Sequence, residues 1–242
     1  MGVTSSRHAE AFTTWLCNLD LEIDLPAGFL VMNPYADSEV QRVVRCFYSR
    51  YLSGSQSRLS IWGINPGRFG AGITGLAFTD PWALNHQLNI PTSLDGRREP
   101  SAIFISAVID AYGGAQAFYD DVLLTAFSPL GFVRSGVNVN FYDDAALQRA
   151  IVPFVAEHVD AVREAGAPSD SILILGSGKL RQFVERYLAP TRRFNHVLAL
   201  DHPRYIMQYR RATMDRYVEQ YVDTIRQHVG RMRQQTMAQN LA

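Results

Sequence analysis

The segment Leu59-Ser60-Ile61-Trp62-Gly63-Ile64-Asn65-Pro66-Gly67-Arg68-Phe69-Gly70 is typical of a buried strand that ends abruptly in a glycine-rich loop. Glycine lets a backbone approach a ligand closely, and Pro66 stiffens the turn and removes one donor. The loop carries a single amide, Asn65, and predicts a site where that amide positions a small molecule or water. The alternative is a tight turn in which Asn65 bonds its own backbone.

Three further apolar runs, Val122–Ala126, Ser171–Leu175 and Val197–Leu200, alternate with helical patterns. The alternation predicts an α/β fold, a three-layer α/β/α arrangement with a central four-stranded parallel sheet. Asp37 or Ser38 and Asp143 are candidate N-caps. The expected helices span 3–19, 36–52, 101–119 with a break at Gly113-Gly114, 143–165, 178–188 and 209–229.

The 242 residues, 47% of them hydrophobic, are enough for one substantial core and predict a single domain, 1–242. Its parts are expected to be a helical N-terminal decoration over 1–57, an α/β core over 58–229 and a frayed polar tail over 230–242. No run of eighteen apolar residues occurs, which favours a soluble, intracellular, cytoplasmic protein, and we expect a monomer with no membrane partner.

The two cysteines, Cys17 and Cys46, stand outside any metal-ligand spacing. Four-cysteine zinc and iron–sulfur sites are therefore excluded, and no metal is expected. Both thiols are predicted to pack in the interior.

The zero net charge hides an asymmetry along the chain. Residues 179–242 carry 12 basic and 5 acidic side chains, and all basic residues but Lys179 are arginines. Because arginine binds phosphate oxygens bidentately and stacks on bases, a polyanionic partner is one interpretation of this segment. A solvated helix face is the other.

Ligands of open parallel sheets bind outside the carboxyl ends of the strands, which draws attention to the loops 63–80, 127–140, 176–179 and 201–209. Gly176-Ser177-Gly178-Lys179 is not a P-loop, because Leu173 stands where the first glycine is required and no Ser or Thr follows the lysine.

Taken in order, Gly-Ile-Asn-Pro-Gly-x-Phe-Gly at 63–70, Thr-Gly-x-x-Phe at 74–78, Pro-Leu at 129–130 and His-Pro at 202–203 resemble the single-strand-selective monofunctional (SMUG) branch of the uracil-DNA glycosylase superfamily. Ser135-Gly136-Val137-Asn138 adds to the likeness, which covers about residues 58–225. The resemblance implies the superfamily's four-stranded parallel sheet and excision of a damaged base from DNA without a cofactor.

The resemblance also implies site residues. Asn65 corresponds to the residue that holds the attacking water, and His202 to the histidine that stabilises the departing base. Phe78 corresponds to the aromatic ring that stacks on the flipped base. The pocket lining would come from residues 63–69 (Gly63, Ile64, Pro66, Gly67, Phe69), and the wedge and DNA contacts from Arg204, Tyr205, Ile206, Met207 and Arg210.

Each of these residues also has a structural interpretation. Phe78 alone would more often be a core residue, and His202 a capping or packed histidine. Asp201 would either raise the pKa of His202 or cap the following helix. Asp80 is a second candidate for activating water, with a turn role as its alternative.

One position departs from the family pattern. Ala126 stands where SMUG enzymes have an asparagine that reads the uracil edge. We expect Ser128 or backbone groups of the first loop to read the base, and a wider substrate range that includes xanthine or hypoxanthine. Two other functions stay open: a damaged-DNA-binding module that has lost turnover, and a hydrolase of free nucleosides.

Overall fold

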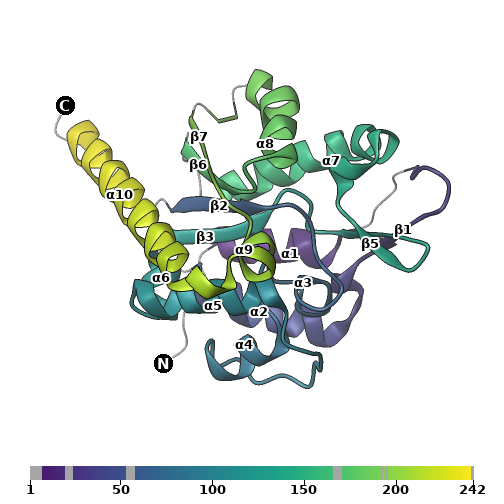
Figure 1. The fold of residues 1–242 in the computed structure, drawn as a ribbon, viewed down its shortest axis with the longest axis horizontal. Helices are drawn as coiled ribbons and strands as arrows, with labels where there is room; N and C mark the ends of the chain where they lie inside the picture. The colour runs from purple at the N-terminus through teal and green to yellow at the C-terminus, as the bar shows by residue number, and fades with distance from the viewer. Residues whose placement is uncertain are drawn as a thin grey trace.

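The computed structural model of the chain describes residues 7–19, 24–52, 58–165, 171–191, 193–194 and 196–240. Its centre is a sheet of four parallel strands in the order β3-β2-β6-β7 (Figure 1). The fold class predicted from the sequence is confirmed. The strands span β2 Leu59–Gly63, β3 Val122–Ala126, β6 Ser171–Leu175 and β7 His196–Leu200.

The sheet is buried on both faces, which explains its continuous apolar strands. Every residue of β2 is buried, and Trp62 is fully buried with its ring stacked on Phe127 at 4.8 Å between centroids. Phe194 meets the same indole edge-on at 5.9 Å. These aromatic contacts fix the strand that leads into the glycine-rich loop.

Helices cover the two faces (Figure 1). On one side lie α5 (Pro100–Tyr112) and α6 (Ala115–Asp121), with the long helix α10 (Met214–Asn240) packed on α5. On the other lie α7 (Ala145–Glu164) and α8 (Lys179–Phe183). The predicted break between α5 and α6 is confirmed, and Gly113 and Gly114 adopt the positive φ values, +125° and +90°, that the bend requires.

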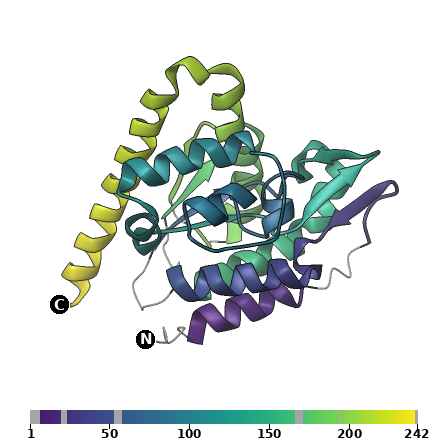
Figure 2. The ribbon, with the colours of Figure 1, turned by 90° about the horizontal axis from the view of Figure 1, so that it is seen from below.

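The N-terminal region is not the helical decoration that the sequence suggested. Helices α1 (Arg7–Cys17) and α2 (Ser38–Tyr51) lie side by side (Figure 2) and place fully buried residues such as Val43 and Val44 in the core. Between them, β1 (Phe29–Met32) belongs to a second sheet. Residues 3–6 of the expected first helix lie outside the described residues.

The second sheet, β1-β4-β5, is antiparallel and was not predicted. The 127–140 region, expected to be a loop, contains β4 (Gly131–Arg134) and β5 (Val137–Val139). Ser135 and Gly136 between them both have positive φ, +49° and +74°, as in the tight turns that match strand twist. Strands of three and four residues are too short to give a clear alternating pattern.

The C-terminal helix differs from its predicted bounds of 209–229. Helix α9 (Pro203–Tyr209) and a 3₁₀ turn (Arg211–Thr213) precede α10, which continues to Asn240. The prediction of a frayed tail over 230–242 is therefore wrong for residues 230–240. Residues 231–240 are mostly polar, but they include arginine, glutamine and methionine, which all have high helix propensity.

Smaller expectations had mixed outcomes. Asp37 caps α2 as predicted, but Asp144, not Asp143, caps α7.

The two cysteines differ in their burial. Cys17 is buried as predicted, whereas Cys46 is exposed, so the packing role predicted for Cys46 is wrong.

The helix predicted over 178–188 begins one residue later, at Lys179, and ends in a π-helical turn at Val184–Leu188. The remaining short elements are η1 Pro34–Ala36, α3 Ala71–Thr74, α4 Pro81–His86, η2 Phe141–Asp143 and η4 Ala189–Thr191.

Within the described residues, no helix by itself has the length and hydropathy needed to cross a membrane; α5 and α6 meet that test only as a pair bent by 92°.

Helix α10 should contribute to global stability through its inner face. Ile225 is fully buried, and Tyr221 meets Phe104 of α5 edge-on at 4.9 Å. We expect Ile225→Ala to lower the free energy of unfolding by about 2–5 kcal/mol because it leaves a cavity. Met237→Ala, on the exposed outer part of the same helix, should change it by less than about 0.5 kcal/mol. Urea denaturation measures both, and equal effects would contradict the packing described.

Candidate active site

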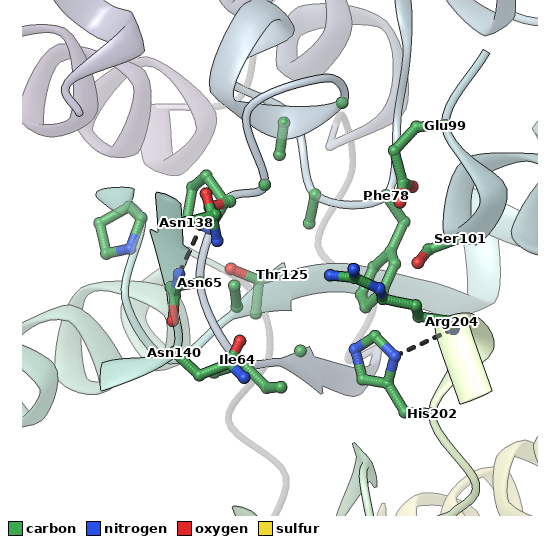
Figure 3. A pocket seen from close by; sticks show the side chains of 18 of the residues that line it. Ile64, Asn65, Phe78, Glu99, Ser101, Thr125, Asn138, Asn140, His202 and Arg204 are labelled. Carbon is green, nitrogen blue, oxygen red and sulfur yellow. Dashed lines mark hydrogen bonds between the residues drawn. The ribbon is translucent and has the colours of Figure 1, made fainter. Parts of the chain in front are cut away.

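A cavity of about 330 Å³ opens where β2, β3 and β7 end. Figure 3 shows Asn65, Asn138 and Asn140 on one side and Phe78, His202 and Arg204 on the other. Ligand cavities of this size at the carboxyl ends of parallel strands are usual for open α/β sheets. Four predicted lining residues border it: Gly63, Ile64, Pro66 and Gly67.

Asn65 is held in one orientation by the backbone of two neighbouring segments. Its Nδ2 donates to the carbonyls of Pro66 (3.3 Å) and Val139 (3.2 Å), and its Oδ1 accepts from the Phe141 N–H (3.1 Å). Both amide hydrogens are therefore used, while Oδ1 keeps one free lone pair. Asn65, which borders the cavity, can therefore accept one further hydrogen bond through Oδ1.

Phe78 lies against the end of β2 because position 63 has no side chain. A Cβ at Gly63 would lie 2.7 Å from two atoms of the Phe78 ring. Phe78 itself has a φ of +53°, a strained backbone conformation for a bulky residue. Such strain persists only where the surroundings impose it, and here it directs an aromatic ring to the cavity.

His202 caps helix α9. Its Nδ1 accepts a hydrogen bond from the Arg204 N–H at 3.0 Å, so the proton of the neutral ring is on Nε2. Figure 3 shows that second nitrogen on the cavity side of the ring. The His202 and Phe78 ring centroids are 5.9 Å apart, which places the donor and the aromatic face beside the same space.

The imidazole of His202 is neutral at physiological pH. Burial, and to a smaller extent the positive charge of Arg204, lowers the pKa of His202 to about 4. Neither role suggested for Asp201 is seen: its carboxylate accepts from the Ser177 hydroxyl at 3.2 Å, and its carbonyl accepts from the Tyr221 hydroxyl.

Asp80, a predicted site residue, makes its hydrogen bonds outside the cavity. Asp80 is completely buried and accepts from the Ala83 N–H (2.9 Å), the Glu99 N–H (3.0 Å) and Arg98 Nε (3.0 Å). It caps α4 and does not border the cavity, so the structure gives it a helix-capping role in place of the turn role that the sequence suggested.

Ser128 does not read the base through its side chain. Its hydroxyl donates to the Leu130 carbonyl (2.7 Å) and accepts from the Leu130 N–H (3.2 Å), and the residue is fully buried away from the cavity. Phe69 also lies outside the cavity, exposed and covered by the Arg97 guanidinium at 3.7 Å from its ring centroid.

The rim of the cavity along α9 carries Arg204, Tyr205, Gln208 and Tyr209. Tyr205 and Tyr209 are 38% and 60% exposed, with ring centroids 5.4 Å apart. The predicted wedge residues Ile206 and Met207 are instead buried, because they lie on the inner face of this helix.

Arg210, predicted to contact DNA, does not border the cavity. It is exposed beside the rim, with its guanidinium 5.7 Å from the Tyr205 ring centroid.

Several cavity residues were missed as site residues. Asn138 stood out in the sequence, and its register opposite Val133 of β4 brings it to the cavity, where its Oδ1 is buried without a hydrogen-bond partner. Glu99 also borders the cavity, and the Glu-Pro pair could have marked it as a cap of α5. The inner lining, which no sequence signal indicated, includes Phe12, Leu16, Tyr35, Tyr48 and His158.

Among the residues that the structure describes, no three His, Cys, Asp or Glu side chains are grouped as metal ligands would be. The cavity itself presents amides, an imidazole and an aromatic ring.

Comparisons with known proteins give the family. The model of the uracil DNA glycosylase superfamily matches residues 50–226. The crystal structure of wild-type Pedobacter heparinus SMUG2 matches with a TM-score of 0.85 and 37% identity, covering 90% of this chain and 97% of that chain. No curated protein sequence matches.

The fold and family define a DNA glycosylase, a hydrolase of N-glycosyl bonds. The chain belongs to the uracil DNA glycosylase superfamily and is similar to its SMUG branch, which confirms the resemblance seen in the sequence.

Asp80 should matter for stability and not for the chemical step. Asp80→Ala removes a helix cap and leaves Arg98 and the Glu99 N–H without their partner. We expect the free energy of unfolding to fall by roughly 2–4 kcal/mol. The rate of base release per folded molecule, measured well below the melting temperature, should stay within about threefold of wild type, since a lost general base costs 10²-fold or more. A larger fall in the rate of base release by fully folded Asp80→Ala would contradict this expectation and support the water-activating role of Asp80.

Proposed function

We propose that the protein hydrolyses the N-glycosidic bond of deaminated bases, uracil and also xanthine or hypoxanthine, flipped out of DNA, and leaves an abasic site. The observation that carries the proposal is the state of His202. It is a neutral imidazole with Nδ1 occupied by a backbone N–H, so that an Nε2–H donor faces a cavity backed by Phe78.

The main catalytic contribution is stabilisation of the leaving base. When the glycosidic bond breaks, negative charge collects on the base, at a carbonyl oxygen of uracil or a ring nitrogen of a purine, and the Nε2–H of His202 donates to it. One oriented donor of this kind commonly contributes roughly 3–4 kcal/mol to transition-state stabilisation. The hydrogen bond from the Arg204 N–H to Nδ1 already orients the His202 ring before substrate binds. The donor therefore needs no reorganisation when the glycosidic bond breaks.

Asn65 holds the attacking water. Because an amide is a poor base, bond breaking runs ahead of water attack and an oxocarbenium-like sugar forms first. The free lone pair of Asn65 Oδ1 accepts one hydrogen of the water and directs its oxygen to the sugar carbon. The proton is lost to solvent after the new C–O bond has formed.

The target nucleotide must leave the base stack, at a cost of a few kcal/mol. Stacking on the Phe78 ring recovers roughly 1–3 kcal/mol. The exposed Tyr205 and Tyr209 rings at the rim offer further stacking surface to neighbouring bases, and the exposed Arg204 and Arg210 offer phosphate contacts.

The enzyme is proposed to be monofunctional. An abasic-lyase step needs an amine at the sugar, and the only lysine, Lys179, is paired with Asp143 at 2.7 Å and does not border the cavity. Without such an amine the reaction ends at the abasic site.

A cleavage assay tests the function. Labelled oligonucleotides with one uracil, xanthine or hypoxanthine, single- and double-stranded, are incubated with the protein and then treated with alkali. We expect strand breaks with wild type, and a fall of about 10²–10³-fold in rate for Asn65→Ala and for His202→Ala. Gln116→Ala, which removes an amide from the exposed surface of α6, serves as the control.

The other outcomes separate the alternatives. DNA that is bound in a gel shift but never cut would identify a damage-binding module. Cleavage of free nucleosides that is unaffected by charge reversal at Arg204 and Arg210 would identify a nucleoside hydrolase. Thermal melting of each variant checks that Asn65→Ala, which also loses bonds to Val139 and Phe141, is folded.

The pH dependence tests the neutral histidine. With a pKa of about 4, His202 stays neutral as pH falls from 7 to 5, so its donor state does not change. We expect the single-turnover rate to show no rise over this range and to fall as pH approaches 4, where protonation of Nδ1 breaks its bond to the Arg204 N–H. A rate that increases below pH 6.5 would mean that a charged imidazole is the active form.

A further inference from the structure

The peptide unit that leads into His202 is held by a residue from another part of the chain. Its carbonyl, that of Asp201, accepts a hydrogen bond from the hydroxyl of Tyr221 in helix α10. Because a peptide unit is planar, the orientation of this carbonyl also sets the direction of the His202 N–Cα bond. The Ser177 hydroxyl bonds to Asp201 as well, at 3.2 Å, but to its carboxylate, so that bond does not hold the peptide unit.

The Tyr221 hydroxyl has little freedom to move. The residue is only 1% exposed, and its ring meets Phe104 of α5 edge-on at 4.9 Å. Helix α10 packs on α5 and on α9, and α5 packs on α9 (Figure 1). The hydroxyl is therefore fixed by the packing of three helices beside the junction of β7 and α9, where His202 lies.

The other hydrogen bonds of His202 come from its own helix. The Ile206 N–H donates to the His202 carbonyl at 3.2 Å, and the Arg204 N–H donates to Nδ1 at 3.0 Å. Both donors belong to α9, so these bonds orient the histidine relative to α9 alone. The Tyr221 bond differs because it ties the start of α9 to α10.

We propose that Tyr221 is a positioning residue for base release: its hydroxyl holds the peptide unit between Asp201 and His202 and so directs the Nε2–H of His202 toward the leaving base. The inference rests on the proposed function, in which that donor stabilises the base. Tyr221 does not border the cavity and touches no reacting atom. It acts through direction, since a misplacement of about 1 Å can cost roughly 100-fold in rate.

Tyr221→Phe tests this role, because it removes the hydroxyl and keeps the ring that packs on Phe104. We expect the single-turnover rate of base release to fall about tenfold or more, as for a misdirected donor. The affinity for DNA that carries an uncleavable analogue of the target nucleotide should stay within about twofold of wild type, because only the chemical step depends on the donor.

Tyr112→Phe is the matched control. Tyr112 is also a buried tyrosine, on α5, and its hydroxyl donates to Asp121 at 2.8 Å, away from the cavity. Its loss removes one hydrogen bond of the same kind, and the single-turnover rate should stay within about twofold of wild type. Rates are measured at saturating enzyme, where the rate constant does not depend on the folded fraction of a variant.

A double-mutant cycle separates positioning from a general loss of structure. If Tyr221 acts through His202, Tyr221→Phe should change the rate by less than about twofold in a His202→Ala background. In an Asn65→Ala background the same substitution should still lower the rate about tenfold, because His202 is present there.

A Tyr221→Phe rate equal to that of wild type, or equal losses in the two backgrounds, would overturn the inference and leave the glycosylase function standing. A wild-type protein that releases no base would instead overturn the proposed function, so the two failures are distinguishable.

Discussion

The side-chain amide of Asn65 links the two sheets of the molecule through hydrogen bonds. The active site depends on these hydrogen bonds, because they fix the orientation of the amide. The residue follows β2 of the parallel sheet, yet its hydrogen bonds reach the Val139 carbonyl and the Phe141 N–H, at and just after the end of β5. The same contacts that orient the amide also hold the antiparallel sheet against the glycine-rich loop. Asn138, next to Val139, is brought to the cavity as a consequence.

The shape of the cavity follows from how β2 and β3 end. The parallel ladder continues past the strands, with Phe127 N–H donating to the Gly63 carbonyl and Ser128 N–H to the Ile64 carbonyl, both at 3.1 Å. Ser128 is thereby turned into the Leu130 bend and away from the ligand space. Because Gly63 has no side chain, the Phe78 ring packs directly against the end of β2. The cavity is therefore lined by strand-end backbone and by the Phe78 ring.

Residues at strand ends were the most predictable part of the site. Asn65 and His202 follow apolar strands, and in a parallel sheet such ends converge, so sequence order was enough to bring them together. Ile206 and Met207 were misassigned because the α9 segment is only seven residues long and its inward face depends on packing against α5. Phe69 was misassigned because a glycine-rich loop has no periodicity from which side-chain direction can be inferred.

The sequence by itself determined the parallel sheet, the family and the identity of the amide, imidazole and ring at the strand ends, because these follow from hydrophobic periodicity and from local motifs. Only the tertiary structure decided that His202 is a neutral helix cap and that residues of α1, α2 and α7 line the cavity. The ionisation of His202 depends on burial and on Arg204, and the inner lining depends on α1 and α7 meeting where His158 stacks on Trp15. Burial and enclosure arise from residues far apart in the chain, and no local pattern encodes them.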